Sequence, residues 1–263
     1  MLNYGFLPPT DEELKSSQDA GYVLGAMGGM KGKQINPSGQ WIEYLPEFEP
    51  QRRKFDTNSC TQFATITAIQ ILEKFLYGET QNYSERALAI LSGNSRNGNS
   101  PHRVADVVRK RGLIREELLP FTDELNSWEE YMKPDPLPRE IRRDGKDWLR
   151  KYKFNHEEVR ETLEGLKVSP LGVSVFAWAK NDKGLYYNPG NKDNHWVCLI
   201  IGYRLGEYWE IFDSYLDDGE PIKKLEWDFP FGYVKSYYLE KREYKECFLR
   251  KIINNFLFAT FSK

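Results

Sequence analysis

The sequence predicts an α+β fold, with a mainly helical N-terminal half, an antiparallel β-sheet in the C-terminal half and a cleft between them. Apolar residues recur at three- and four-residue steps from Phe63 to Leu76, which is the spacing of one helix face. Beyond Pro170 the chain changes to short runs of Val, Ile, Phe, Tyr and Trp separated by Gly, Asn, Asp and Lys, which are typical of strands. Because the helices come first, the pattern differs from alternating βαβ units. A cleft between two such halves is the natural place for a ligand.

Residues that start or stop helices set the expected bounds of the elements. Gly78 is a favourable stop for the first helix, Pro101 suits the first turn of another, and Asn155 is a favourable N-cap before acidic residues. The expected helices cover residues 60–78, 84–91, 101–111 and about 155–166, and the expected strands cover residues 172–178, 195–203, 208–213 and 232–239.

The chain is expected to have four parts. Residues 1–40 form an extended leader, because closely spaced glycines interrupt any helix there. Residues 41–165 form the mainly helical half and residues 166–240 form the β-rich half. Residues 241–263 form an apolar-rich tail.

Composition excludes several classes of function. The chain has 263 residues with 37 basic and 39 acidic side chains, and its net charge of −2 gives no electrostatic reason to bind nucleic acid. It has no apolar run long enough to span a membrane and no visible signal sequence. Its cysteines, Cys60, Cys198 and Cys247, are too few for a disulfide framework, and no Cys or His cluster has metal-ligand spacing. We therefore expect a reduced protein without metal or cofactor, located in the cytoplasm or in a virion, with no nucleic-acid or membrane partner.

Cys60 is the candidate nucleophile. It stands at the start of the first expected helix, where unpaired backbone amides place partial positive charge near the sulfur. An imidazolium beside it would stabilise the thiolate further. The alternative is that Cys60 is a small buried residue on the apolar face of the helix.

His195 is the candidate base and Asp213 is the candidate orienting group. His195 opens an apolar strand, and Asp213 ends the following strand. The carboxylate is expected to accept a hydrogen bond from one ring nitrogen while the other nitrogen faces the thiol. A histidine at a strand rim also has a purely structural interpretation. The other two histidines, His102 and His156, stand at expected helix starts and are interpreted as packing or surface residues.

The segments around these residues resemble the papain-like cysteine peptidases over about residues 41–239. Residues 59–64, Ser-Cys-Thr-Gln-Phe-Ala, are similar to the family's nucleophile segment, and residues 194–203 are similar to its histidine-bearing strand. Residues 208–215 are similar to its Tyr-Trp-x-x-x-Asn-Ser-Trp element, with Asp213 in place of asparagine. The candidate nucleophile and base are also separated by the roughly 130–150 residues usual in this family. The resemblance implies the papain-like fold, with the active-site cleft between its two halves.

The resemblance also assigns supporting residues. Gln51, or alternatively Asn58, would supply the side-chain donor of the oxyanion hole. Gly98 and Asn194 would border the substrate, whose backbone the family lays against a glycine-containing edge. Tyr215 would replace the tryptophan that shields the hydrogen bond between base and orienting group from water.

The implied function is hydrolysis of a peptide bond in a polypeptide substrate, through a Cys60 thiolate and a thioester intermediate. Two alternatives stay open. A transglutaminase or a cell-wall amidase uses the same Cys-His-Asp triad with another acceptor or another substrate. A catalytically silent papain-like module of a larger assembly, for example a viral one, would use the leader or the tail to bind a protein partner.

Overall fold

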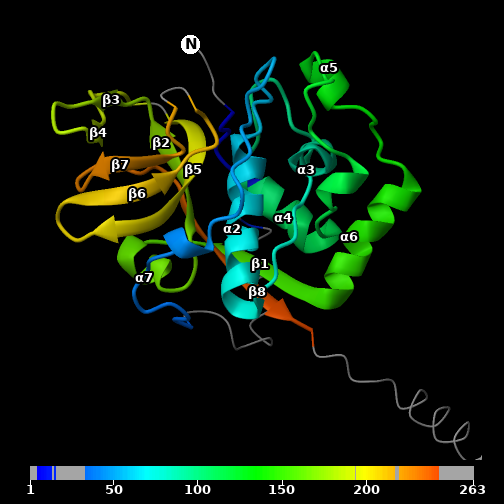
Figure 1. The fold of residues 1–263 in the computed structure, drawn as a ribbon, viewed down its shortest axis with the longest axis horizontal. Coiled ribbons are helices and arrows are strands. Elements are labelled where there is room, and N and C mark those ends of the chain that lie inside the picture. Colours follow the sequence, from blue (N-terminus) through cyan, green and yellow to red (C-terminus); the bar gives the residue numbers. More distant parts are fainter. Residues whose placement is uncertain (1–4, 14, 16–32, 193, 217–218, 243–263) are drawn as a thin grey trace, which may run out of the picture.

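Helix α2 (Cys60–Tyr77) stands between a β-sheet on one side and the other long helices on the opposite side (Figure 1). The computed structural model describes residues 5–13, 15, 33–192, 194–216 and 219–242. The first fourteen residues of α2 are buried, because the helix packs on strands and on helices at once. Gly78 ends α2 at φ 67°, a left-handed conformation that glycine adopts without steric cost. The first predicted helix is therefore confirmed.

Two further helices begin at serine N-caps. The Ser84 hydroxyl accepts a hydrogen bond from the Ala87 amide at 2.9 Å, and the Ser100 hydroxyl accepts one from the Arg103 amide at 3.3 Å. The second and third predicted helices are thereby confirmed. The helices besides α2 are α3 (Glu85–Ser92), α4 (Pro101–Arg111), α5 (Trp128–Tyr131), α6 (Arg139–Lys151) and α7 (Thr162–Leu166), with 3₁₀ turns η2 (Ile42–Tyr44) and η3 (Glu116–Leu118).

Among the described residues, the strands form one mostly antiparallel sheet in the order β1-β8-β2-β5-β6-β7-β4-β3. The four predicted strands are present as β2, β5, β6 and β8, and the α+β prediction is confirmed. Strand β5 is hydrogen-bonded to β2 on one side and to β6 on the other, so it lies well inside the sheet. The strands are β1 (Tyr152–Glu158), β2 (Leu171–Phe176), β3 (Ala179–Lys180), β4 (Tyr186–Tyr187), β5 (Asn194–Arg204), β6 (Tyr208–Phe212), β7 (Ile222–Glu226) and β8 (Val234–Lys241).

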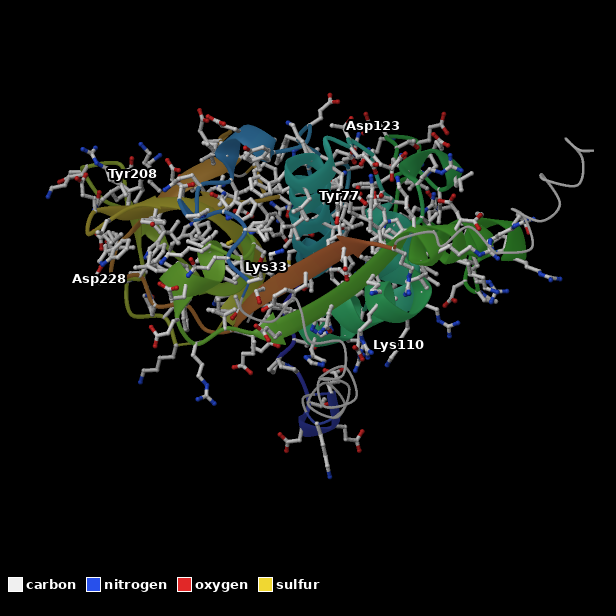
Figure 2. The ribbon with its side chains drawn as sticks, turned by 90° about the horizontal axis from the view of Figure 1, so that it is seen from below. Lys33, Tyr77, Lys110, Asp123, Tyr208 and Asp228 are labelled. Atoms are coloured by element: carbon white, nitrogen blue, oxygen red, sulfur yellow. The ribbon has the colours of Figure 1, made fainter. Side chains whose placement is uncertain are left out.

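The helix predicted around residues 155–166 is wrong. Residues 152–158 form strand β1, and only the short α7 is helical there. Alternate side chains of β1, among them Phe154 and His156, are buried, and this period of two outweighs a favourable N-cap. β1 is paired along its whole length with β8, so a strand from the middle of the chain lies beside one near its end (Figure 2).

The predicted leader and tail lie partly outside the described residues. Of residues 1–40 the structure describes 5–13, 15 and 33–40, and of the tail it describes residues 241 and 242. The docking role suggested for the tail therefore stays a prediction. Within the described part of the chain, no helix combines the length and the apolar composition needed to cross a membrane.

Candidate active site

Cys60 is the first residue of α2, and its side chain is fully buried. The backbone amide of Val197 in β5 donates a hydrogen bond to the Cys60 sulfur at 3.3 Å. This contact joins the first turn of a helix to a strand that lies 137 residues later in the chain. It fixes the sulfur relative to β5.

His195 lies two residues before Val197 on the same strand. Two residues advance a strand by about 6.6 Å. The pairing of β5 with β2 shifts register at His195, because Val175 pairs with Trp196 and Phe176 with Asn194. The structure therefore brings the candidate base and the candidate nucleophile to the same part of the molecule. Asn194 is the first residue of β5, and its predicted contact with the substrate stays a prediction.

Asp213 directly follows β6 and is buried with a lysine that sequence reasoning missed. Its carboxylate accepts a hydrogen bond from the Tyr215 amide at 3.1 Å and forms an ion pair with Lys223 Nζ at 3.3 Å. The same ammonium donates to the carbonyl oxygens of Tyr215 and Glu220 at 3.0 and 2.9 Å. The side chains of the ion pair are only 1% and 3% exposed, so each charge depends on the other.

A second carboxylate, Asp56, contacts three of the predicted site residues. It accepts hydrogen bonds from the Tyr215 hydroxyl at 3.1 Å, from the Asn58 amide at 2.9 Å and from Gln51 Nε2 at 3.4 Å. Arg52 forms an ion pair with it at 3.0 Å. Sequence reasoning missed this residue, because a single aspartate in a loop belongs to no recognisable motif.

The loop that carries Gln51 is tied to the end of β6. The Gln51 amide donates to the Ser214 carbonyl at 3.1 Å, and the Ser214 hydroxyl donates to Gln51 Oε1 at 2.6 Å. Gln51 is fully buried, so its side chain is held next to the residue that follows Asp213. Asn58, the alternative oxyanion donor, has a left-handed backbone at φ 51°, and its carbonyl lies against Gly5.

The leader crosses this site and is bonded to both halves of the molecule. Its Gly5 carbonyl accepts from the Asn99 amide, and its Leu7 amide donates to the Asn99 carbonyl, each at 3.0 Å. Its Phe6 amide donates to the His195 carbonyl at 3.3 Å. The leader thus lies between the start of α4 and the start of β5.

Two glycines show how closely the leader approaches. A Cβ added to Gly5 would lie 3.0 Å from the Cys60 sulfur, and a Cβ added to Gly98 would lie 1.9 Å from the Gly5 carbonyl oxygen. Gly98 also has φ 85°, a backbone conformation that disfavours other residues. Gly98 therefore lets a peptide backbone approach it, and in this structure that backbone is the leader.

The surroundings of Cys60 favour the neutral thiol. Burial raises the pKa of the Cys60 thiol to about 12, with smaller contributions from the charges of Asp56 and Asp213 and against the opposing hydrogen bond from Val197. The thiolate expected from the sequence is therefore not the form that this conformation stabilises. The sulfur is covered and protonated.

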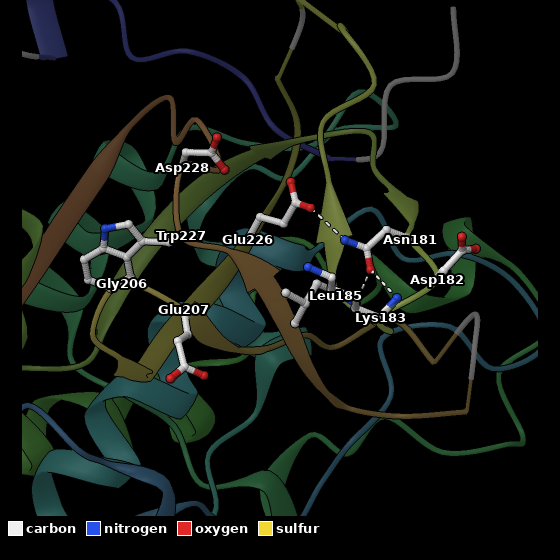
Figure 3. A pocket seen from close by; sticks show the side chains of 9 residues that line it. All are labelled: Asn181, Asp182, Lys183, Leu185, Gly206, Glu207, Glu226, Trp227 and Asp228. Carbon is white, nitrogen blue, oxygen red and sulfur yellow. Dashed lines mark hydrogen bonds between the residues drawn. The ribbon is translucent and has the colours of Figure 1, made fainter.

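A separate hollow lies at the β3 and β7 side of the sheet, away from Cys60 (Figure 3). Part of its wall is internally paired. The side-chain amide of Asn181 donates to Glu226 at 2.7 Å, and its side-chain oxygen accepts from the backbone amides of Lys183 and Leu185 at 2.9 and 3.0 Å. None of the predicted site residues lines this hollow, so it is not part of the candidate active site. Its lining consists of Asn181, Asp182, Lys183, Leu185, Gly206, Glu207, Glu226, Trp227 and Asp228.

Comparison with solved structures identifies the fold as that of papain-like cysteine proteases. No family model and no curated protein sequence matches the chain. The structure is similar to digestive procathepsin L 3 of Tenebrio molitor larval midgut, with a TM-score of 0.57 and 13% identity over 80% of this chain and 72% of the other. It is similar to a recombinant stem bromelain precursor, with a TM-score of 0.54 and 14% identity over 91% and 77% of the two chains. It is also similar to bromelain from Ananas comosus in complex with the E64 inhibitor, with a TM-score of 0.55 and 16% identity over 76% and 98%.

The chain therefore has the papain-like α+β fold. At identities of 13% to 16%, these similarities establish the fold alone.

Proposed function

We propose that the protein is a thiol-dependent peptidase in which Cys60 is the nucleophile, His195 the base and Asp213 the orienting carboxylate. The observation that carries this proposal is the hydrogen bond from the Val197 amide to the Cys60 sulfur, two residues along β5 from His195. The papain-like fold supports it independently, since the solved structures of similar fold are cysteine proteases.

The proposed reaction transfers an acyl group to sulfur and then to water. The His195 imidazole takes the proton of the Cys60 thiol, and the sulfur attacks the substrate carbonyl carbon. The imidazolium gives this proton to the leaving amine, and a thioester remains. Water, deprotonated by the same imidazole, then attacks the thioester, and the acid and the thiol are released. Asp213 would hold the ring through its other nitrogen, and the Gln51 amide group would donate to the oxyanion.

A polypeptide substrate is favoured by the way the leader binds. The leader is an extended segment held by backbone hydrogen bonds to Asn99 and His195, which are contacts that any extended peptide can make. A substrate would use the same backbone groups, so in this proposal the leader leaves the site before the substrate binds. Exposure of the Cys60 sulfur to water and to the imidazole would then lower its pKa from about 12.

The test is a peptide-library cleavage assay on the chain with and without residues 1–8. We expect turnover by the chain without residues 1–8 and none by the same shortened chain carrying Cys60→Ala, because the thioester can no longer form. Cys198→Ala is the matched control, since Cys198 is another buried free thiol and lies on β5. Equal turnover by the shortened chain with and without Cys60→Ala would remove Cys60 from the mechanism.

The same assay separates the triad alternatives by their products. Hydrolysis leaves a new carboxylate, whereas a transglutaminase leaves an isopeptide when an amine is present. A cell-wall amidase would cut glycan-linked peptides and leave the library intact.

A catalytically silent module is the second candidate, and the covered sulfur of Cys60 favours it. Labelling with a thiol-directed epoxide distinguishes it from an enzyme. An enzyme freed of residues 1–8 should react at Cys60 much faster than at Cys198. In a silent scaffold both cysteines should be labelled at the same slow rate.

The free thiols of Cys60 and Cys198 support the further proposal that the protein works in a reducing compartment, either the cytoplasm or a virion made there.

A further inference from the structure

Three metal-ligating side chains meet outside the candidate active site. His102 and Asp106 stand four residues apart on α4 and therefore on one face of that helix. His156 comes from β1, which packs against α4. One ligand atom from each of the three residues lies within 4.8 Å of the other two. Sequence spacing did not reveal this group, because it depends on the packing of a strand on a helix.

His102 is buried, and no described residue forms a hydrogen bond with its ring. It is 2% exposed, and among the described residues neither Nδ1 nor Nε2 of its ring has a partner. Buried polar atoms nearly always have one, so this ring requires an explanation. The His102 and His156 ring centroids are 5.0 Å apart. A metal ion bound between the two rings would supply the missing partner.

The contact between Asp106 and His156 has a length that suits tetrahedral coordination. Asp106 Oδ1 and His156 Nε2 are 3.3 Å apart. Two ligand atoms bonded to zinc at about 2.0 Å in a tetrahedron are separated by roughly 3.3 Å. These two atoms therefore need little movement to bind one ion. His102 needs a side-chain rotation, which no hydrogen bond to its ring opposes.

We propose that His102, Asp106 and His156 bind a zinc ion, with a fourth coordination position open to water. Two imidazoles and one carboxylate form a ligand set typical of zinc. The site is separate from Cys60 and does not depend on the proposed peptidase function.

Neighbouring cations hold the Asp106 carboxylate and face the His156 ring. Arg109 and Lys110 donate to the Asp106 carboxylate at 2.8 and 2.9 Å. Lys235 Nζ lies 2.9 Å from His156 Nδ1. Because zinc at Nε2 leaves the proton of the neutral ring on Nδ1, the Lys235 ammonium has to turn away from the ring when the ion binds. These positive charges disfavour Ca²⁺ and Mg²⁺, which depend on carboxylate charge, more than zinc, which binds neutral imidazole well. The Asp106 side chain is 11% exposed, so its carboxylate is in contact with solvent.

A bound ion would join α4 to β1. The first turn of α4 also holds the leader, because Arg103 forms an ion pair with Glu13 at 2.7 Å. A ligand that binds only the folded state raises the melting temperature. At zinc concentrations about a hundred times the dissociation constant, we expect a rise in Tm of about 5 °C.

The test uses tag-free protein carrying Cys60→Ala and His195→Ala, so that His102 and His156 are the only histidines left of the three in the chain. Zinc is added to this metal-free background and counted by mass spectrometry, and cobalt is added separately so that its visible spectrum reports the coordination. We expect one ion per chain. His102→Gln should weaken binding at least about tenfold. Arg103→Gln, a change at the next residue of the same helix, should leave binding unchanged.

Histidine NMR of the background protein distinguishes a missing site from a variant that fails to fold. Because two imidazoles remain, zinc should shift the ring signals of both. No zinc binding, unshifted ring signals, or equal affinity in His102→Gln and its background would each overturn the proposal. Peptidase activity in a protein that binds no zinc would leave the proposed function standing, since no zinc ligand belongs to that site.

Discussion

Two carboxylates, the buried Asp213 and the half-buried Asp56, place negative charge near the Cys60 sulfur. Asp213 is balanced by Lys223 inside the protein, whereas Asp56 is bound by neutral donors and by the half-exposed Arg52. Burial is the main reason that the pKa of the Cys60 thiol is raised, and the negative charges of Asp56 and Asp213 add to it, so the covered form of the site keeps a neutral sulfur. The residues of the proposed triad were visible in the sequence because they begin or end elements. Asp56 and Lys223 were not, because lone charged residues usually belong to the surface.

Lys223→Ala tests the buried ion pair. It would remove the ammonium that pairs with the buried Asp213 carboxylate, and we expect the free energy of unfolding to fall by about 3–5 kcal/mol. Urea unfolding measures this loss. Lys224→Ala is the matched control, because Lys224 is the exposed neighbour on the same strand, and it should cost less than about 1 kcal/mol. Similar losses for the two variants would contradict a stabilising role for the pair.

Gly98→Ala tests the contact between the leader and the site. The new Cβ would collide with the Gly5 carbonyl, so the leader should be displaced and Cys60 should be alkylated several-fold faster. Mass spectrometry of the labelled peptide measures that rate. Gly93→Ala carries a similar left-handed strain at φ 64° with nothing within 4 Å of its Cβ, and it should leave the rate unchanged. Equal rates in the two variants would mean that the leader does not depend on Gly98.

Glu73 makes stability depend on pH. It is fully buried in α2, where its Oε1 accepts hydrogen bonds from the Tyr83 hydroxyl at 2.6 Å and the Trp148 indole at 3.3 Å. Burial raises the pKa of Glu73 from 4.5 to about 7. Between these values the folded chain keeps a proton that the unfolded chain has lost. The stabilisation is complete below pH 4.5 and is lost as the pH rises toward 7, by roughly 3 kcal/mol.

Glu73→Gln keeps the acceptor oxygen and removes the titration. Between about pH 5 and about pH 7.5, urea unfolding should show that Glu73→Gln loses roughly 2 kcal/mol less of its free energy of unfolding than the unmodified protein. Glu117→Gln is the control, because Glu117 is 63% exposed and should not alter the pH dependence. If the free energy of unfolding changes equally with pH in Glu73→Gln and in the unmodified protein, Glu73 is ionised in the folded protein.

Elements were predictable from the sequence where apolar periodicity and terminating residues agree. α4 has the predicted bounds because Ser100, Pro101 and Gly112 mark its ends. α6 was missed because charged residues fill most of its thirteen positions, although Ile141, Trp148 and Leu149 lie on one face that packs on the core.

The strand β1 shows the limit of local patterns. Its sequence contains a favourable helix N-cap, yet it is a strand because β8, about eighty residues later, pairs with it along its whole length. No pattern within residues 152–158 reveals that partner. The zinc ligands and the position of the leader depend on contacts of the same long-range kind, so neither was predictable from the sequence.

At the scale of the whole molecule, the leader connects the two halves that a substrate would have to contact. It is bonded to Asn99 at the start of α4 and to His195 in β5, and the buried Phe6 ring joins the main hydrophobic core. Binding of the leader therefore both covers the sulfur of Cys60 and ties the helical half to the sheet. The segment that closes the site is therefore the same segment that connects the helical half to the sheet.

Removal of residues 1–8 should convert the covered thiol into a reactive one. Without Gly5 over the sulfur, burial no longer opposes ionisation, so the midpoint for alkylation of Cys60 should fall from about pH 12 to below about pH 9. The rate of iodoacetamide labelling, followed by mass spectrometry across this range, measures the change. Cys198 is the internal control, because burial keeps its pKa high in both forms. A synthetic peptide of residues 1–12 added to the shortened chain should slow the labelling again. Identical pH profiles of labelling for the full-length and the shortened chain would mean that the leader does not cover Cys60 in solution.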